Sequence, residues 1–246
     1  MAGDSGRALN SMLDGPRMRI GGGYYVFRLY WIMEQSMKAL SSVLDHLVYI
    51  TPDVDQTIKD LGKKLGVDAI PGGQHQTWGT RNALIALGPK MYLEIMGPDP
   101  TLSRPGLKRP FDIDRLYKPR LVTWVSRSTD LDKTIELGRQ LGVDLGEVQS
   151  GSRVRPDGTV LSWKMTDLMK PRVNGIVPYF INWGKSKHPA SSAPAGCLLK
   201  ELKAEHPNPN QINSILKAFG LDLQISHGKS TNLMAIIETK QGTVEI

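Results

Sequence analysis

The chain has 246 residues, of which 40% are hydrophobic and 22% are charged, so it is long enough to bury a large globular core. No apolar run reaches the roughly 18 residues that a membrane-spanning helix needs, and we therefore expect no membrane partner. The formal net charge is +7, but Lys and Arg are scattered along the chain. Scattered charge argues against a nucleic-acid partner and suits acidic small molecules.

Cys197 is the single cysteine, which excludes an intramolecular disulfide and a thiolate zinc site within one chain. A reducing compartment is then the simplest expectation, and we expect a cytoplasmic location. Residues 1–43 carry acidic side chains and lack the apolar core and cleavage site of a secretory signal. We interpret them as an N-terminal extension, with an organelle presequence as the open alternative.

The first repeating pattern begins at Leu44. The segment "LDHLVYITPDVDQTIKDLGKKLGVD" (44–68) predicts an apolar strand, an aspartate that caps a helix, an amphipathic helix and a glycine stop. "AIPGGQHQTWGT" predicts a Gly-rich turn region with short extended flanks, and "RNALIALG" and "PKMYLEIMG" predict two further strands. We therefore assign residues 44–118, including a Pro-rich connector, to a first βαβββ module.

The same order of elements returns twice. "PRLVTWVSRSTDLDKTIELGRQLGVD" (119–144) predicts a second strand and helix, and the Pro-Asp-Gly of "VRPDGTVLSWKM" predicts a hairpin after them. "VPYFINWG" closes this second module, which we assign with its connector to residues 119–196. "LLKELKAEHPNPNQINSILKAFGLD" (198–222) is a fainter copy, and it predicts a third, degenerate module over residues 197–246.

The motifs "LDHLVY", "GGQHQTWGTRNALIALG", "YLEIMGPDP", "RPDGTVLSW" and "PYFINWGKSKHPA" occur in this order along the chain. In order and spacing they resemble the glyoxalase-like branch of the vicinal oxygen chelate superfamily (glyoxalase, bleomycin resistance and extradiol dioxygenase), and the likeness runs from Leu44 to Ile246. The resemblance implies an α+β fold in which βαβββ modules form half-open mixed β-barrels around a cavity, with the helices outside. In the superfamily's metalloenzymes, a His on the first strand and a Glu on the last strand of each module hold a divalent ion.

Carried onto this sequence, the resemblance places His46 on the first strand and Glu94 on the last strand of module one. The two are therefore candidate catalytic residues and ligands of a divalent metal ion, whose identity is open and which can also be absent. In the second module Thr123 stands opposite His46 and Asn182 stands opposite Glu94. Neither is a strong metal ligand, so we predict that both contact the substrate instead.

The third module offers weaker replacements for the missing ligands. Its alignment places Glu201 opposite His46 and Glu245 opposite Glu94. If modules one and three face each other, the four side chains form a metal site of one His and three carboxylates.

The Gly-rich segment "GGQHQTWGTRN" is the second candidate for chemistry. Its glycines let the backbone approach a ligand closely, while His75 can act as a general acid or base. Arg81 and Asn82 supply a cation and an amide for substrate binding. The structural alternative is a hairpin bend whose polar side chains satisfy their own turn.

The aromatic residues Trp78, Trp163 and Trp183 have the size to line a cavity for an organic ligand, and core packing explains them equally well. We take Trp163 as a candidate substrate contact. A homodimer is a further open possibility, because modules of this superfamily pair within a chain or between chains.

Two classes of function follow. The first is a metal-dependent enzyme of lyase or isomerase type that acts on a small oxygenated, anionic organic molecule. The second is a metal-free protein of the same fold that binds or sequesters a small molecule. His46 with Glu94 favours the enzyme, whereas the loss of ligand-type residues at Thr123 and Asn182 favours the binding protein.

Overall fold

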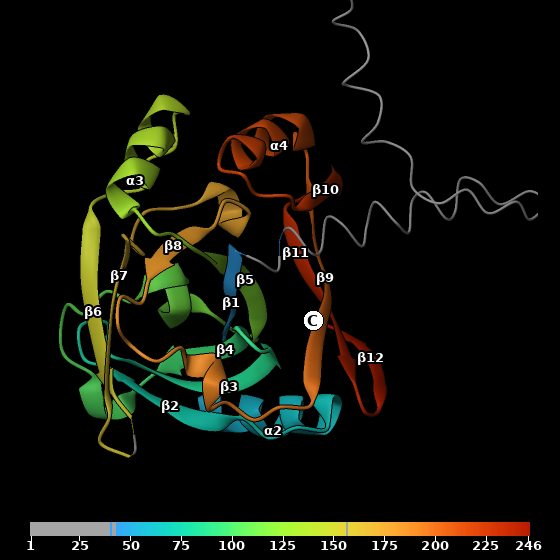
Figure 1. Cartoon of the computed structure of the whole chain (residues 1–246). Helices are drawn as coiled ribbons and strands as arrows, with labels where there is room; N and C mark the ends of the chain where they lie inside the picture. The colour runs from blue at the N-terminus through green and yellow to red at the C-terminus, as the bar shows by residue number, and fades with distance from the viewer. Residues whose placement is uncertain (1–39, 41–42, 156) are drawn as a thin grey trace, which may run out of the picture. The chain divides into compact units, whose positions relative to one another are not determined.

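Three times along the chain, a strand is followed by one helix and then by three strands (Figure 1). The structure, a computed structural model, describes residues 40, 43–155 and 157–246. The first group comprises β1 (Leu44–Ile50), α2 (Val54–Leu65), β2 (Ile70–His75), β3 (Thr80–Gly88) and β4 (Met91–Pro98). The second comprises β5 (Arg120–Arg127), α3 (Leu131–Gln140), β6 (Val148–Val154), β7 (Val160–Thr166) and β8 (Tyr179–Asn182). The third comprises β9 (Cys197–His206), α4 (Pro209–Ala218), β10 (Gln224–His227), β11 (Asn232–Thr239) and β12 (Gly242–Glu245).

The first two groups share one eight-stranded mixed sheet, in the order β2-β3-β4-β1-β5-β8-β7-β6. The first strands of the two groups, β1 and β5, pair antiparallel at its centre, and each pairs in parallel with the last strand of its own group. The two outer strands, β2 and β6, lie against each other, so the sheet curls into a nearly closed barrel. The predicted α+β barrel with helices outside is therefore confirmed.

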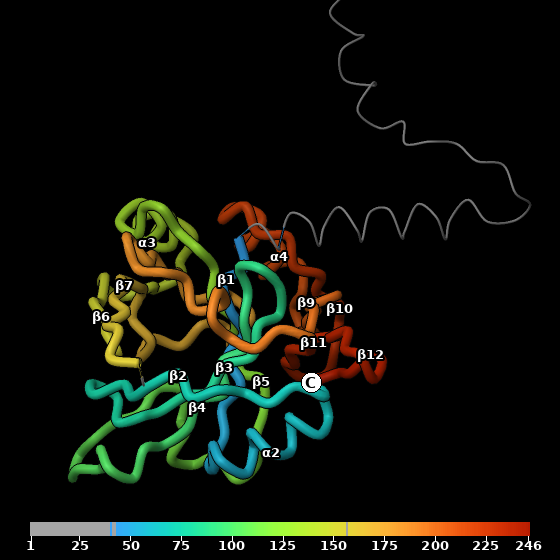
Figure 2. The backbone as a smooth tube through the Cα atoms, turned by 60° about the horizontal axis from the view of Figure 1, so that its bottom comes forward, coloured from blue at the N-terminus to red at the C-terminus, as the bar shows by residue number. Residues whose placement is uncertain are grey.

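The third group forms its own four-stranded sheet, in the order β10-β9-β11-β12. This second sheet lies beside β3 and β5 of the barrel (Figure 2). Buried residues alternate with more exposed ones along β9 and β11, so one face of the second sheet is buried. Leu199, Leu202, Leu233 and Ile237 on that face join the same hydrophobic core as Leu93 of the barrel.

Alternation along the barrel strands separates two cores. On β4, Leu93 and Ile95 belong to the core outside the barrel, whereas Met96 belongs to the core inside it. Because side chains of a strand alternate between its faces, Tyr92 and Glu94 point inward with Met96. The interior is thus apolar except where the sequence places a polar residue at an inward position.

Aspartate side chains cap α2, as the sequence predicts, and α3. Asp53 accepts a hydrogen bond from the backbone N–H of Gln56 at the start of α2, and Asp130 accepts one from Lys133 at the start of α3. Gly66 ends α2 in the left-handed conformation with φ of 67°. These caps place both helices directly after the strands that form the centre of the barrel.

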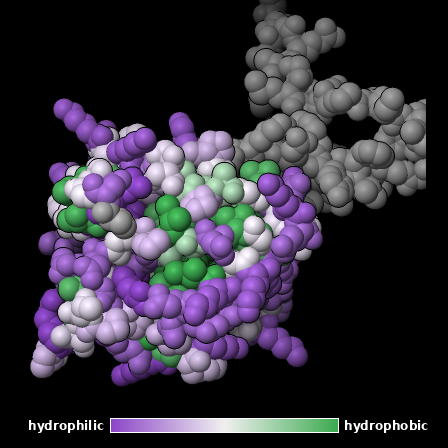
Figure 3. All heavy atoms as spheres, turned by 90° about the horizontal axis from the view of Figure 1, so that it is seen from below, coloured by the Kyte–Doolittle hydropathy of each residue, from purple (hydrophilic) through white to green (hydrophobic). Residues whose placement is uncertain are grey.

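Hydrophobic side chains gather at the centre of the face shown in Figure 3, and hydrophilic ones surround them. None of the helices in the described part of the chain is long and apolar enough to cross a membrane. The extension expected over residues 1–43 lies outside the described residues, apart from Leu40 and Val43.

We expect Asp53→Ala and Asp130→Ala each to lower the free energy of unfolding by about 1 kcal/mol, because each leaves a backbone N–H of the first helical turn without its acceptor. Urea unfolding followed by circular dichroism measures the effect. Asp53→Asn is the matched control, since asparagine also caps, and it should stay close to the parent. A loss as large in Asp53→Asn as in Asp53→Ala would contradict the capping role.

Candidate functional site

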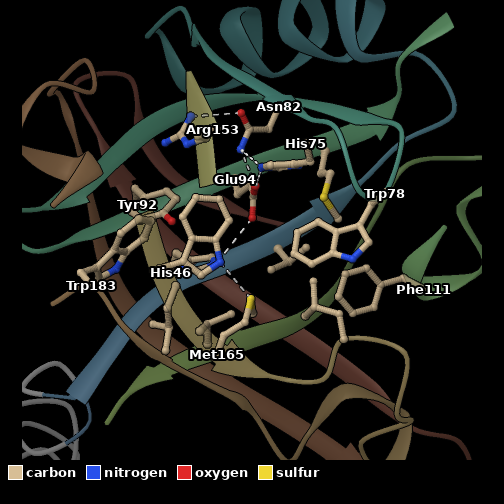
Figure 4. A pocket seen from close by; sticks show the side chains of 16 residues that line it. His46, His75, Trp78, Asn82, Tyr92, Glu94, Phe111, Arg153, Met165 and Trp183 are labelled. Carbon is tan, nitrogen blue, oxygen red and sulfur yellow. Dashed lines mark hydrogen bonds and ion pairs between the residues drawn. The ribbon is translucent and has the colours of Figure 1, made fainter. Parts of the chain in front are cut away.

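A cavity lies inside the barrel and draws side chains from both halves of the eight-stranded sheet (Figure 4). Its volume is about 30 Å³, which is room for about one or two waters. Tryptophan, methionine and aliphatic side chains make up most of the wall. The polar or charged residues that line it, tyrosine and tryptophan aside, are His46, His75, Asn82, Glu94 and Arg153.

An extra residue in β1 shapes the reactive side of the cavity. Leu44 pairs with Ser126 and His46 pairs with Val125, so two steps along β1 face one step along β5. Asp45 is therefore the additional residue of a β-bulge, which shifts the alternation of the strand. As a result Leu44 joins the outer core while His46 and Val48 line the cavity, and Asp45 is fully buried next to His46.

Asp45 joins several parts of the chain through its carboxylate. It lies 2.7 Å from Nδ1 of His46, 3.1 Å from Nε2 of His188 and 3.4 Å from Nε of Arg127. Nε1 of Trp183 donates to both of its oxygens, at 3.2 and 3.1 Å. Burial by itself raises the pKa of this carboxyl group, but the hydrogen bonds from His188 and His46 outweigh it and hold the pKa well below its usual range.

The ionised Asp45 determines which nitrogen of His46 carries a proton. A carboxylate accepts hydrogen bonds only, so Nδ1 of His46 must be the donor. In neutral His46 the other nitrogen, Nε2, then carries a lone pair, and it lies 3.5 Å from Oε2 of Glu94. Two groups with facing lone pairs need a proton or a cation between them. The ring of His46 is also stacked on Tyr92 at 4.5 Å between centroids, which restricts its rotation.

Asn82 connects Glu94 to the far wall of the cavity. Its Oδ1 accepts from Nη1 of Arg153 at 3.3 Å, which identifies Nδ2 as the atom that donates to Oε1 of Glu94 at 2.5 Å. Gly72 of β2 runs so close to this contact that a Cβ there would collide with both Asn82 and Arg153. The sequence predicts that Gly72 lets a ligand approach the backbone; in the structure it makes room for the contact between Asn82 and Arg153.

His75 is neutral and has both nitrogens occupied. Nδ1 lies 3.0 Å from Oγ1 of Thr80, and Nε2 lies 3.4 Å from Nδ2 of Asn82 and 3.8 Å from Oε1 of Glu94. Complete burial lowers the pKa of His75 to about 4, although the nearby Glu94 charge acts in the opposite direction. At neutral pH this geometry suits a residue that positions Asn82 and Glu94.

Arg153 brings a positive charge to the cavity wall. It is 4% exposed, and within the described ranges no carboxylate forms an ion pair with it. A buried guanidinium beside a cavity favours an anionic ligand, because the charge is costly to bury without a partner.

The structure brings together some of the residues that the sequence singled out. His46, Glu94, His75, Asn82 and Trp163 all line the cavity. Trp78 and Trp183 line it as well. The tryptophans therefore both pack in the inner hydrophobic core and form part of the cavity wall.

The other singled-out residues lie elsewhere. Arg81 forms a bidentate ion pair with Asp55 on the surface, and Asn182 donates to the backbone oxygen of Thr129. Thr123 is buried, donates to the backbone oxygen of Gly175 and does not line the cavity. Glu201 and Glu245 belong to the second sheet and do not line the cavity.

Sequence reasoning missed Asp45 and Arg153. An acidic residue inside the apolar strand "LDHLVYI" was a signal for Asp45, since a carboxylate in a buried strand needs partners. His188, in the connector after β8, is one of these partners. Arg153 had no comparable signal, because a basic residue is unremarkable in the largely polar segment "VQSGSRV" of β6.

The described donors fit part of a metal site. Nε2 of His46 and the carboxylate of Glu94 face each other, and Asp45 holds the His46 ring as carboxylates behind metal-bound histidines do. Across the described ranges of the chain, however, no three His, Cys, Asp or Glu side chains are grouped to hold a metal ion. Any bound ion would need further ligands from water or substrate.

Comparison with known proteins identifies the fold. Residues 44–220 match the glyoxalase-like domain family. Among solved structures, a hypothetical protein from Staphylococcus aureus aligns with a TM-score of 0.58 and 16% identity, over 81% of this chain and 91% of that one. Methylmalonyl-CoA epimerase from Mycobacterium tuberculosis aligns with a TM-score of 0.36 and 20% identity, over 56% and 86% of the two chains. No curated protein sequence matches the chain.

The matched residues make up most of the chain, which therefore belongs to the glyoxalase-like domain family. The predicted membership of the vicinal oxygen chelate superfamily is confirmed. The family and the fold are compatible with an enzyme that acts on a small molecule, and they leave the reaction open.

We expect the protein to lose stability as the pH falls below 6.5, because unfolded His75 takes up a proton near pH 6.5 whereas folded His75, with a pKa of about 4, does not. The free energy of unfolding should be about 2 kcal/mol lower at pH 5 than at pH 7 from this residue. Urea unfolding at both values measures it. His75→Gln should remove most of the dependence and the exposed His227→Gln should keep it; equal slopes in the two variants would contradict the assignment.

Proposed function

We propose that this glyoxalase-like protein is an enzyme of lyase or isomerase type, which binds a small oxygenated organic anion in the barrel cavity and uses a divalent metal ion held by His46 and Glu94. One observation carries the proposal. Nε2 of His46 and Oε2 of Glu94 face each other at 3.5 Å inside an apolar wall, with the His46 tautomer determined by Asp45. This is an arrangement that a cation stabilises.

Each residue around His46 and Glu94 has a separate role in the proposed enzyme. Asp45 keeps the proton on Nδ1 of His46, so Nε2 remains a lone-pair donor. Asn82, positioned by His75 and Arg153, donates to Glu94 and orients its carboxylate. Arg153 binds an anionic group of the substrate, and the aromatic wall excludes water. The bound ion would supply Lewis-acid polarisation of neighbouring substrate oxygens.

Substrate entry requires a change in the wall, since the cavity has a volume of about 30 Å³. An organic molecule needs several times this space. Side-chain rotation of the aromatic residues in the wall provides it, at the cost of contacts such as that between Trp163 and Trp183, whose centroids lie 5.4 Å apart.

The second candidate is a metal-free protein of the same fold that binds a small molecule. The absence of a three-residue metal cluster within the described residues favours it. Thr123 and Asn182 do not line the cavity, which also favours it, because the second half of the barrel then adds only apolar and aromatic groups and Arg153.

Elemental analysis of protein purified without chelator or affinity metal separates the two candidates. We expect near-stoichiometric divalent metal in the parent and its loss in His46→Ala and Glu94→Ala. Glu201→Ala is the matched control, because Glu201 lies on the second sheet and should leave the metal content unchanged. A parent without metal, and without a thermal shift on adding zinc, manganese or nickel, would leave the binding protein as the better account.

Arg153 should determine the preference for anions. Isothermal titration of pyruvate, lactate and malonate into the parent should detect binding, and Arg153→Gln should weaken it roughly tenfold to a hundredfold, the value of one buried charge-assisted hydrogen bond. Arg153→Lys should retain part of the affinity. Arg81→Gln serves as the control, since Arg81 pairs with Asp55 outside the cavity. Binding weakened as much by Arg81→Gln would contradict the role of Arg153.

A further inference from the structure

A second and larger hollow lies next to the cavity. It has a volume of about 1030 Å³ and runs between the barrel and the second sheet. We call it the outer groove and define it by the residues that line it, 109–112, 118–123, 168–169, 171–172, 174–175 and 231–234, together with Tyr49, Tyr179, Glu245 and Ile246.

The outer groove and the cavity share a wall. Phe111 and Leu168 line both hollows. The ring of Phe111 contacts Tyr179 edge-on at 5.6 Å, and Figure 4 shows it next to Trp78 at one end of the cavity, with Trp183 at the other. Displacement of the Phe111 ring would therefore connect the two hollows.

The backbone on both sides of this wall is strained. Of the described residues other than glycine, those with positive φ are Phe111, Asp112, Val173 and Asn174, with φ of 62°, 52°, 43° and 52°. All four belong to the two segments that border the groove. Positive φ is unfavourable for bulky and β-branched side chains, and such strain concentrates at ligand sites and moving segments.

The third group of strands completes the groove. Thr231, Asn232, Leu233 and Met234, at the start of β11, form one side, and Leu121 to Thr123 of β5 contribute to the rest of the lining. The family match stops at residue 220, before this side begins. The groove is therefore a feature that the third group adds to the barrel.

The lining combines apolar and basic residues. Four of the residues are Arg or Lys and two are Asp or Glu. Arg109 pairs with Asp114, and Arg172 binds backbone oxygens and is 1% exposed. Lys118 and Arg120 are exposed at the start of β5, and neither forms an ion pair within the described chain. These two cations remain available to a ligand.

We propose that the outer groove is the second compartment of the ligand site. The ligand is an elongated amphipathic anion. Its oxygenated head enters the cavity past Phe111, and its tail lies in the groove, where an anionic group contacts Lys118 and Arg120. The inference deepens the proposed function and rests on it for the head group. It also places outside the barrel the part of an organic substrate for which the cavity of about 30 Å³ has no room.

Fluorescence titration with 8-anilinonaphthalene-1-sulfonate tests the groove, and the neutral N-phenyl-1-naphthylamine is the matched probe. The double variant Lys118→Gln/Arg120→Gln should bind the sulfonate roughly tenfold more weakly and the neutral probe unchanged, as expected for two partly exposed charge contacts. Lys59→Gln, on the exposed face of α2, should match the parent with both probes. Equal binding of the sulfonate by the double variant and the parent would overturn the proposal.

Acrylamide quenching of tryptophan fluorescence tests the shared wall, since Trp78, Trp163 and Trp183 line the cavity. Phe111→Ala should increase the quenching constant at least twofold, while Phe111→Leu, which keeps an apolar plug, should stay near the parent. Tyr117→Ala, an 85% exposed aromatic on the same connector, should change nothing. Unchanged quenching in a folded Phe111→Ala variant would show that the hollows are not connected there.

The two proposals fail separately. His46→Ala and Glu94→Ala should bind the sulfonate like the parent, because neither residue lines the groove. A protein without metal but with the expected groove behaviour would retain the two-compartment site and lose the metal. A protein with metal and no effect at Lys118, Arg120 and Phe111 would retain the enzyme and lose the groove.

Discussion

The buried carboxylate of Asp45 is the interaction on which the rest of the site depends. Removing a carboxylate from water is costly, and it is tolerated only where several donors surround it. Here the donors come from β1 itself, from β5 through Arg127 and from the connector after β8 through Trp183 and His188. The charge therefore ties the centre of the barrel to the connector after β8, and it orients His46 at the same time.

The bulge at Asp45 explains how β1 places Leu44 outside the barrel and His46 inside it. Without the extra residue, the alternation of β1 would send His46 and Leu44 to the same side. With it, Leu44 packs in the outer core and His46 enters the cavity. One extra residue in β1 thus lets Leu44 pack on the outside of the barrel while His46 joins the polar cluster inside it.

The polar cluster and the outer groove have different origins. The cluster depends on the pairing of the first two groups of strands, because Arg153 from β6 meets Asn82 from β3 only where the barrel nearly closes. The groove depends on the third group, whose sheet packs against the outside of the barrel and leaves a hollow beside Phe111 and Leu168. A compact reactive centre and a spacious exterior compartment can therefore belong to one ligand site, as we propose.

The strands and helices and their order follow from local patterns in the sequence. Helix caps, glycine stops and hydrophobic periodicity are local properties, which is why a capping aspartate before the first helix and the three strand-helix patterns could be identified without a structure. The motif containing His46 and Glu94 likewise predicted two residues that meet, since β1 and β4 pair in parallel with Val48 opposite Glu94. The further groups that join His46 and Glu94 depend on contacts between distant parts of the chain. Arg153, His188 and Trp183 come from distant segments, and Glu201 and Glu245 lie on a separate sheet because the third group pairs its own strands rather than extending the barrel. Strand pairing between distant segments depends on which faces must be buried together, and that choice is made by the packing of the whole chain.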